Sequence, residues 1–397
     1  MLFLQKPGKD SPYRMEVQPE ALQVPGFQPQ SMRAPFYNAE RNSWQVFRYD
    51  DVKRILSDYH AFSSQREALD PQQSSELNAG QRSAPTMISL DPPEHRVYRD
   101  LAGKTFTPRR IEEQEPFIRE TVEQLLAKVA GQGTMDMIDD FAYLLPITVI
   151  ARMLGVPNAD QPQFKQWTDD FFEFVTPAAA RAQKELALYF QGLFEERRRE
   201  PQDDFISALL TTEVEGKTFT NRDLIGLCSL LLLAGNDTTR HLIGNALLCF
   251  DAYPENMEQL RTQPDLISNA VEEVLRYLPS ISSPARVATS GIVIEGQTIQ
   301  AGQWILPMVA SANRDEAHFP NAEIFDIRRT PNRHLTFGFG VHFCLGAPLA
   351  RLESKIALEM LLAHFTDIKR VRSIPLEAAV SPQLYGVKHL PITFTRI

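Results

Sequence analysis

The chain has 397 residues, 23% of them charged, and a formal net charge of -9 at pH 7. This length allows one large core or two average domains. The acidic balance excludes a generic nucleic-acid binder and a protein of anionic membrane surfaces, because both kinds of partner require basic surfaces.

Cysteine usage excludes further classes. Only Cys228, Cys249 and Cys344 are present, and they form neither a C-x-x-C pair nor a C-x-x-C-H sequence. A disulfide framework, a zinc ribbon and covalently attached c-type haem are therefore excluded. We expect a protein of the reducing cytoplasm. Residues 1–4 are too few for a membrane anchor, because charged Lys6 and Lys9 follow them.

The first hundred residues are predicted to hold an extended segment, one strand and two helices. Residues 1–40 are an extended lead-in within the domain, 43–48 alternate like a strand, and a helix runs to residue 55. The polar residues 66–83 are expected to form a loop. Asp91 is expected to cap the next helix, with Pro92 at its first position and Glu94 completing a capping box.

The rest of the chain is predicted to be mostly helical. Helices are expected at 111–130, 140–155, 160–175, 178–199, 203–212, 221–251, 254–262, 265–278 and 346–365. Strands are expected within 287–311, with turns at Glu295-Gly296 and Ala301-Gly302, and again at 390–394. No repeat or long linker divides the chain. We therefore predict one domain, residues 1–397, that is mainly α with a small β-rich region.

The centre of the helix predicted at 221–251 carries polar residues that a buried helix does not need. The run from Ala234 to Thr239 is A-G-N-D-T-T. Thr238 is able to bond back to the Ala234 carbonyl, and Asp237 to pair with Arg240, which would be a purely local arrangement. Alternatively, the small residues leave room beside the helix, and the hydroxyl and the acid relay protons into that space.

Cys344 lies in the most informative segment. The pattern F-G-x-G-x-H-x-C-x-G runs from Phe337 to Gly346 and enters a helix. The glycines Gly338, Gly340 and Gly346 permit positive φ and close backbone approach, so that backbone N–H groups can point at the sulfur. A lone cysteine is more often a small buried apolar residue. In this turn we interpret it as an axial ligand of an iron macrocycle.

Together with A-G-N-D-T-T, this pattern resembles the cytochrome P450 family of haem-thiolate monooxygenases. The resemblance implies a triangular prism of helices around a buried haem b, with Cys344 as the iron ligand. It implies that Thr238 hydrogen-bonds the bound oxygen and that Asp237 helps to deliver protons. The residues implied in cofactor binding besides Cys344 are Phe337 and Gly338 of the turn and, for the propionates, His95, Arg99, Arg286 and His342. A buried structural triad of Glu273, Arg276 and Arg329 is also implied.

Substrate and partners follow less directly. The resemblance implies O2 and a hydrophobic small molecule as substrates. The pocket walls implied are residues 66–89, Trp167, Phe171, Phe172, Phe174, Leu231, Ala234, residues 280–283, Leu384 and Tyr385. The chain contains no flavin or iron–sulfur module. Electrons are therefore expected from a ferredoxin or flavodoxin with its reductase, and the protein is expected to be a monomer. The redox partner would dock on a basic patch of Arg96, Lys104, Arg109, Arg110 and Arg333. Alternatively, these residues form only a solvated charged face.

Two other functions remain open at this stage. One is a haem-thiolate enzyme that bypasses reduction, as a peroxygenase or isomerase. The other is a non-catalytic haem-binding or sensor protein. The acid–threonine pair at Asp237 and Thr238 argues against both, because only oxygen activation requires protons beside the iron.

Overall fold

The computed structural model describes residues 34–65, 86–172, 176–379 and 384–397. Its helices are α1 (Tyr49–Ser57), α4 (Glu94–Thr105), α5 (Pro108–Glu112), α6 (Glu115–Val129), α7 (Leu144–Leu154), α8 (Gln161–Phe172), α9 (Pro177–Arg199), α10 (Phe205–Thr211), α11 (Asn221–Ala252), α12 (Pro254–Thr262), α13 (Ile267–Tyr277), α14 (Val309–Ala312) and α15 (Ala347–His364). Short turns of other helix types are η2 (Met87–Ser89), η3 (Met137–Ala142), η4 (Asn158–Asp160), η5 (Pro264–Leu266) and η6 (Gly340–His342). The expected mainly α fold is confirmed.

Strands form three small sheets. The first has the order β1 (Phe36–Asn38), β2 (Ser43–Val46), β8 (Trp304–Pro307), β5 (Arg286–Ala288) and β3 (Phe62–Ser63). In it β2 and β8 run parallel and the other pairs antiparallel. The second sheet joins β4 (Thr134–Asp136), β10 (Pro391–Arg396) and β9 (Phe365–Arg370), and β6 (Ile292–Ile294) pairs with β7 (Gln297–Ile299) as a hairpin.

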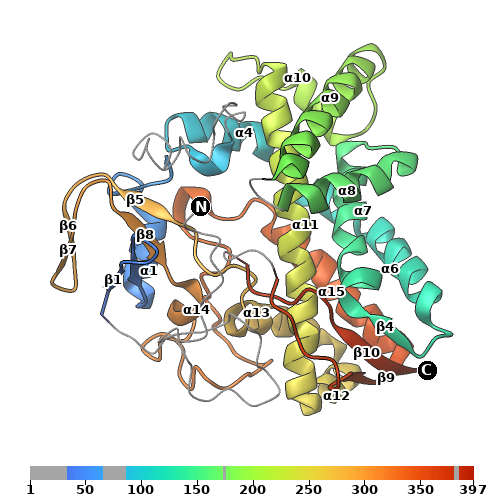
Figure 1. Ribbon diagram of the computed structural model, residues 1–397. Helices are drawn as coiled ribbons and strands as arrows, with labels where there is room; N and C mark the ends of the chain where they lie inside the picture. Colours follow the sequence, from blue (N-terminus) through green and yellow to red (C-terminus); the bar gives the residue numbers. More distant parts are fainter. Residues whose placement is uncertain (1–33, 66–85, 173–175, 380–383) are drawn as a thin grey trace.

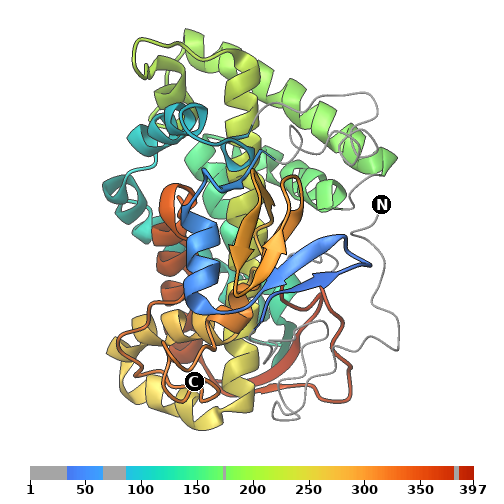
Figure 2. The same ribbon diagram turned by 90° about the vertical axis from the view of Figure 1, so that its left-hand side faces the viewer.

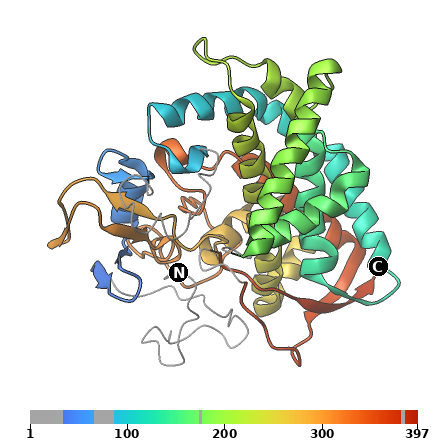
Figure 3. The same ribbon diagram turned by 45° about the horizontal axis from the view of Figure 1, so that its top comes forward.

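Helix α11 is the central element of the molecule. It runs vertically through Figure 1, with the five-stranded sheet on one side and α6, α7 and α8 on the other. Turned by 90°, the molecule presents this sheet and α1 in front of α11 (Figure 2). When the top of the molecule is turned forward, α9 is seen to cross α11 (Figure 3). Thr220 caps α11 in a full capping box with Asp223, which explains the sharp start of this helix.

Two cores meet at the turn before α15. The larger core packs α11 against α6, α7, α9, α13 and α15, and the smaller one lies between α1, the five-stranded sheet and α14. The turn from η6 to α15 packs on α1 and leads directly into a helix of the larger core. It is therefore held from both sides. Within the described ranges, no helix is both long and apolar enough to cross a membrane.

Two expectations about local structure are wrong. Asp91 does not cap α4, which begins at Glu94 without a side-chain cap. Its carboxylate instead accepts hydrogen bonds from the Ser63 hydroxyl and the Ser64 backbone N–H, and these contacts join β3 to the start of α4. The strand region predicted to extend to residue 311 ends at Pro307, and α14 follows. Residues 1–33 of the predicted lead-in and the whole predicted loop at 66–83 lie outside the described residues.

Candidate active site

Cys344 lies three residues before Ala347, the first residue of α15. Its backbone N–H donates to the Phe337 carbonyl at 2.8 Å, which closes the turn. The sulfur itself accepts hydrogen bonds from the backbone N–H groups of Gly346 and Ala347. Burial raises the pKa of the Cys344 thiol, whereas these two N–H groups and the nearby Arg99 and Arg351 lower it. A sulfur with such donors is suited to carry negative charge.

The glycines of the turn have different roles. Gly338 has φ +74° and Gly340 has φ +73°, as expected. A Cβ at Gly340 would lie 2.8 Å from the Ser57 Cα, so that α1 packs directly on the turn backbone. Gly346 has φ −82°, and nothing lies within 4 Å of a Cβ built on it. The expectation of a positive φ at Gly346 is therefore wrong, and this residue contributes its N–H.

All four residues implied in propionate binding come together. The rings of His95, on α4, and His342, in η6, lie 4.2 Å apart between centroids. Burial, together with the charges of Arg286, His95 and Arg99, lowers the pKa of His342 to about 3. Burial and the Arg99 charge likewise lower the pKa of His95. The four groups therefore share one electropositive space.

The carboxylates of Asp91 and Asp100 oppose part of the positive charge at His95. The Asp91 carboxylate acts on His95 but is held by Ser63 and Ser64. The buried Nε2 of His95 has no hydrogen-bond partner among the described residues. An anionic ligand with several acceptor oxygens would satisfy both the charge and the orphaned nitrogen. A haem, with two propionates and an iron that takes a sulfur ligand, fits these residues.

The middle of α11 has an open face. Ala234 is exposed, and Leu230 and Thr238, four residues to either side, are partly exposed, whereas residues 241–250 are all buried. Residues four apart lie on one face of a helix, so this stripe borders one space. Thr238 donates its hydroxyl to the Ala234 carbonyl at 2.9 Å. The local hydrogen bond considered from the sequence is thus present, beside an open surface.

Asp237 is buried next to this face and forms an ion pair with Arg240. His241 Nε2 lies 3.7 Å from the same carboxylate oxygen. Burial raises the pKa of Asp237, and the Arg240 guanidinium opposes that rise. Arg240 also lies over the Tyr143 ring, 5.4 Å from its centroid. The acid is therefore held by its local cation.

The predicted structural triad is confirmed as a set of contacts. Arg276 donates to both carboxylate oxygens of Glu273, at 2.8 and 2.7 Å. Arg329 Nε lies 3.2 Å from the same carboxylate, and Asn332 donates to it at 3.1 Å. Arg276 further donates to the carbonyls of Asn313, Ala322 and Ile324. This network fastens α13 to the chain that leads to the Cys344 turn.

The implied pocket walls have mixed outcomes. Trp167 is buried among Phe164 and Tyr189 at the α8–α9 contact and bonds Glu185, so its assignment to a pocket wall is wrong. Residues 280–283 and 384–385 lie side by side, because Ile281 bridges Leu384 and Tyr385 donates to the Ser280 carbonyl. Phe174 lies outside the described residues, as do the side chains of Phe171 and Phe172.

The expected basic patch is largely neutralised within the chain. Arg109 pairs with Glu113 at 2.9 Å, Arg96 with Asp100 at 3.7 Å and Arg110 with Asp203 at 3.8 Å. Lys104 donates to the Glu213 carbonyl at 2.7 Å.

Around the sulfur turn, Phe339 and Phe343 expose about two fifths of their surface (40% and 41%), and the Lys53 ammonium lies 4.6 Å from the Phe339 ring centroid.

Sequence reasoning missed one group beside the turn. Arg351 on α15 lies over the Phe337 ring and pairs with Glu272 of α13, which also contacts His334. The adjacent acids Glu272 and Glu273 could have indicated a second ion pair, because consecutive residues of a helix face different neighbours. Which neighbours these were could not be read from the sequence.

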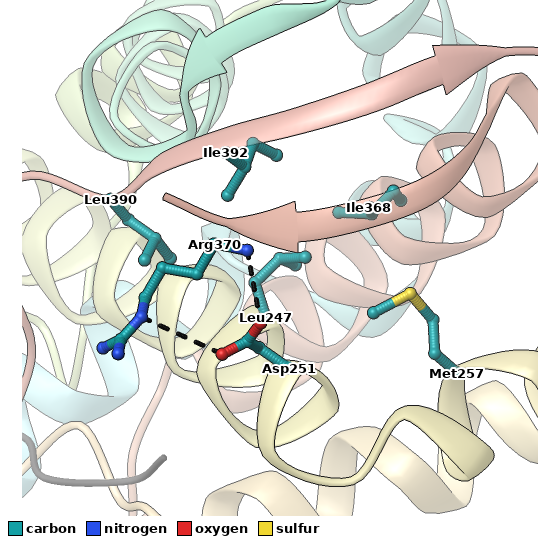
Figure 4. Close-up of a pocket in the computed structure, with 7 residues that line it drawn as sticks. All are labelled: Leu247, Asp251, Met257, Ile368, Arg370, Leu390 and Ile392. Carbon is teal, nitrogen blue, oxygen red and sulfur yellow. Dashed lines mark hydrogen bonds and ion pairs between the residues drawn. The ribbon is translucent and has the colours of Figure 1, made fainter. Parts of the chain in front are cut away.

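A cavity in Figure 4 is unrelated to this site. It has about 10 Å³, roughly room for one water molecule, and lies between α11 and the β9–β10 strands. Asp251 and Arg370 approach each other at its edge, and the other lining residues are Leu247, Met257, Ile368, Leu390 and Ile392. It contains none of the predicted site residues.

Comparisons with known proteins agree with this geometry. The family model described as Cytochrome P450 matches residues 36–265 and 261–376. The chain is 41% identical to "Putative cytochrome P450 YjiB" of Bacillus subtilis, over 89% of this chain and 88% of the relative. It is 36% identical to "Cyclomarin C epoxidase CymV" of Salinispora arenicola, over 88% and 90% of the two chains. The crystal structure of CYP109E1 from Bacillus megaterium in complex with testosterone superposes with a TM-score of 0.82, at 37% identity, covering 90% of this chain and 95% of that one.

Proposed function

Because this chain belongs to the cytochrome P450 family and is a haem-thiolate monooxygenase, we propose that Cys344 is the sulfur ligand of a haem b. The hydrogen bonds from the Gly346 and Ala347 N–H groups to the sulfur carry this proposal. We extend it to a single domain of 397 residues that acts as a monomer in the cytoplasm. The three unpaired cysteines are consistent with a reducing compartment.

His95, Arg99, Arg286 and His342 are the propionate partners in this proposal. Their mutual electrostatic effect and the orphaned His95 Nε2 support this role. Phe337 and Gly338 shape the turn, the first by accepting the Cys344 N–H and the second by its positive φ. When bound, the haem supplies activation of O2 with two electrons and transfer of one oxygen atom to substrate.

The protein residues then handle protons and substrate. Thr238 presents its hydroxyl at the open face of α11, where it would be able to donate to an acceptor in that space instead of the Ala234 carbonyl. Asp237 is paired with Arg240, and when this contact loosens the carboxylate takes up a proton that it can then pass toward Thr238. The exposed face along Leu230, Leu233 and Ala234 accepts a hydrophobic small molecule. A steroid is a reasonable first probe, since CYP109E1 was crystallised with testosterone.

Electrons come from a separate acidic ferredoxin or flavodoxin with its reductase in this proposal. The Phe339 and Phe343 rings beside Cys344 offer an apolar contact, and the Lys53 ammonium lies over the Phe339 ring. Exposed aromatic residues with cationic neighbours suit such a partner. Because the predicted basic patch is paired internally, the rate of electron transfer is expected to depend only weakly on salt.

The test is the spectrum of the reduced CO complex. The wild type is expected to show the strongly red-shifted Soret band of thiolate ligation, and Cys344→Ser to lose it. Cys249→Ser, at a buried cysteine in α11, serves as the control and should keep the band. A red-shifted band in Cys344→Ser would contradict the assignment. Product formed only with peroxide, and not with NADPH and surrogate redox partners, would favour a peroxygenase.

A further inference from the structure

Arg351 is held in one orientation by α13. Its Nε and Nη2 donate to the two carboxylate oxygens of Glu272, at 2.7 and 2.9 Å. This two-pronged geometry fixes the plane of the guanidinium. His334 Nε2 lies 3.2 Å from Glu272, and its Nδ1 accepts the Thr336 N–H at 3.3 Å. With Nδ1 as acceptor, His334 contacts Glu272 through an Nε2–H donor.

The orientation of Arg351 reaches the sulfur turn through Phe337. The guanidinium carbon lies 4.5 Å from the centroid of the Phe337 ring, which is within the range of a cation–π contact. The carbonyl of Phe337 accepts the Cys344 N–H. Fixing the ring therefore fixes the residue that closes the turn. The chain of contacts runs from Glu272 through Arg351 and Phe337 to Cys344.

The charge of Arg351 also acts on the sulfur, and Glu272 is its counter-charge. Burial alone would raise the pKa of Glu272, but the hydrogen bonds from Arg351 and His334 hold it at about 2. This carboxylate is therefore ionised at neutral pH. Arg351 is among the cations that lower the pKa of Cys344, after the larger effect of burial, which raises it. The Glu272 carboxylate is the counter-charge of Arg351, so it offsets part of the positive charge that acts on the sulfur.

We propose that Arg351 and Glu272 are positioning residues for the Cys344 sulfur: Arg351 clamps Phe337, and the balance of the two charges sets the reduction potential of the iron that the sulfur binds. The inference rests on the proposed role of Cys344. The reduced form carries one more electron, so a nearby positive charge stabilises it and a nearby negative charge destabilises it. The two residues act with opposite sign.

The experiment measures the haem midpoint potential by spectroelectrochemical titration in purified, haem-loaded full-length protein. Arg351→Met should shift the potential to more negative values, and Glu272→Gln to more positive ones. Arg351→Lys keeps the charge but loses the two-pronged bond, and should lie closer to the wild type. The double variant should return toward the wild type.

Arg119→Met is the matched control. Arg119 on α6 also donates to both oxygens of an α15 carboxylate, Glu359, at 3.4 and 3.3 Å. Unlike Arg351, Arg119 is not among the cations that lower the pKa of Cys344. The haem midpoint potential of Arg119→Met should equal that of the wild type. Haem content and thermal unfolding are recorded for every variant.

Opposite signs are the critical result, because mere loosening of the α13–α15 contact would shift both single variants the same way. Shifts of the same sign, or no shift beyond Arg119→Met, would overturn the proposal. An unchanged potential with slower reduction by a redox partner would also overturn it and make Arg351 a docking residue. If Arg351→Met fails to bind haem, Glu272→Gln and Arg351→Lys decide the question. Failure of the Cys344 assignment would appear separately, as a wild type without the thiolate Soret band.

Discussion

Arg240 forms an ion pair with the buried Asp237 one turn earlier on α11. This contact keeps the acid away from free exchange with solvent and compensates part of the cost of its burial. Asp237, which the sequence suggested as a proton donor, is therefore held by Arg240. Mutation of Arg240 tests whether the breaking of this ion pair matters for turnover.

Arg240→Met should therefore change the pH dependence of turnover. Without the guanidinium, the already raised pKa of Asp237 rises further, so the acid stays protonated to higher pH. The pH above which product formation declines should move upward. Loss of the pair should also cost about 3 kcal/mol of unfolding free energy. Arg198→Met, at an exposed cation bonded to Asn221, should do neither.

The sign for stability follows from the same shift. Asp237 has a folded-state pKa above its unfolded value. The native state therefore binds the proton more tightly, and this contribution to stability is lost as pH rises through the folded-state pKa. Removal of Arg240 should strengthen that dependence. A pH profile of product formation that is identical in Arg240→Met would contradict a proton-donating role for Asp237.

Thr238→Ala should leave haem bound but uncouple NADPH consumption from product formation. The hydroxyl at the open face of α11 is lost, while the backbone remains helical. Product formed per NADPH should fall by about tenfold or more. Thr121→Ala removes the same kind of i−4 hydrogen bond on α6, at 2.8 Å to the Phe117 carbonyl, and should keep the ratio. Full coupling in Thr238→Ala would refute the assignment.

Two glycines of the sulfur turn should differ sharply in tolerance. Gly340→Ala places a Cβ 2.8 Å from the Ser57 Cα at φ +73°, so the turn or α1 must move. We expect a loss of about 1–3 kcal/mol and incomplete haem loading. Gly346→Ala, with φ −82° and open space, should load haem normally. The ratio of Soret to protein absorbance measures both.

Haem retention should depend on the electropositive cluster. Arg99→Leu removes a cation expected to bond a propionate, and a charge-assisted hydrogen bond contributes about 1.5–3 kcal/mol. Haem transfer to an excess of a haem-scavenging globin should therefore speed up by about tenfold or more. Arg96→Leu, on the same helix but exposed and paired with Asp100, is the control. Equal transfer rates in the two variants would exclude Arg99 from propionate binding.

The triad should matter for folding. Glu273→Ala leaves Arg276 buried without its counter-charge, which should cost about 3–5 kcal/mol. Glu359→Ala breaks a part-exposed pair with Arg119 and should cost less than about 1 kcal/mol. Chemical denaturation of the two haem-loaded variants measures the difference. Similar costs would mean that burial of the triad adds nothing beyond a surface ion pair.

Long helices were the part of the fold most accurately predicted from the sequence. The prediction of 221–251 matches α11 at Asn221–Ala252, and 254–262 matches α12. Caps, prolines and periodic apolar residues are local signals, so they mark these ends without knowledge of the rest. The strands β1, β3, β4 and β9 were missed, because short strands are defined by pairing with other segments and carry little local signal.

Motif spacing identified the residues of the site, but only the tertiary structure decided how they are used. The sequence by itself determined the sulfur turn and the acid–threonine pair, because their residue types and spacing are local, and the family resemblance added the four residues of the electropositive cluster. The fold decided that Asp91 bonds Ser63 and Ser64, that Gly346 supplies an N–H, and that Glu272 holds Arg351 over Phe337. Partner choice and burial depend on segments up to hundreds of residues apart, and they set the charges and hydrogen bonds on which the chemistry of the sulfur depends.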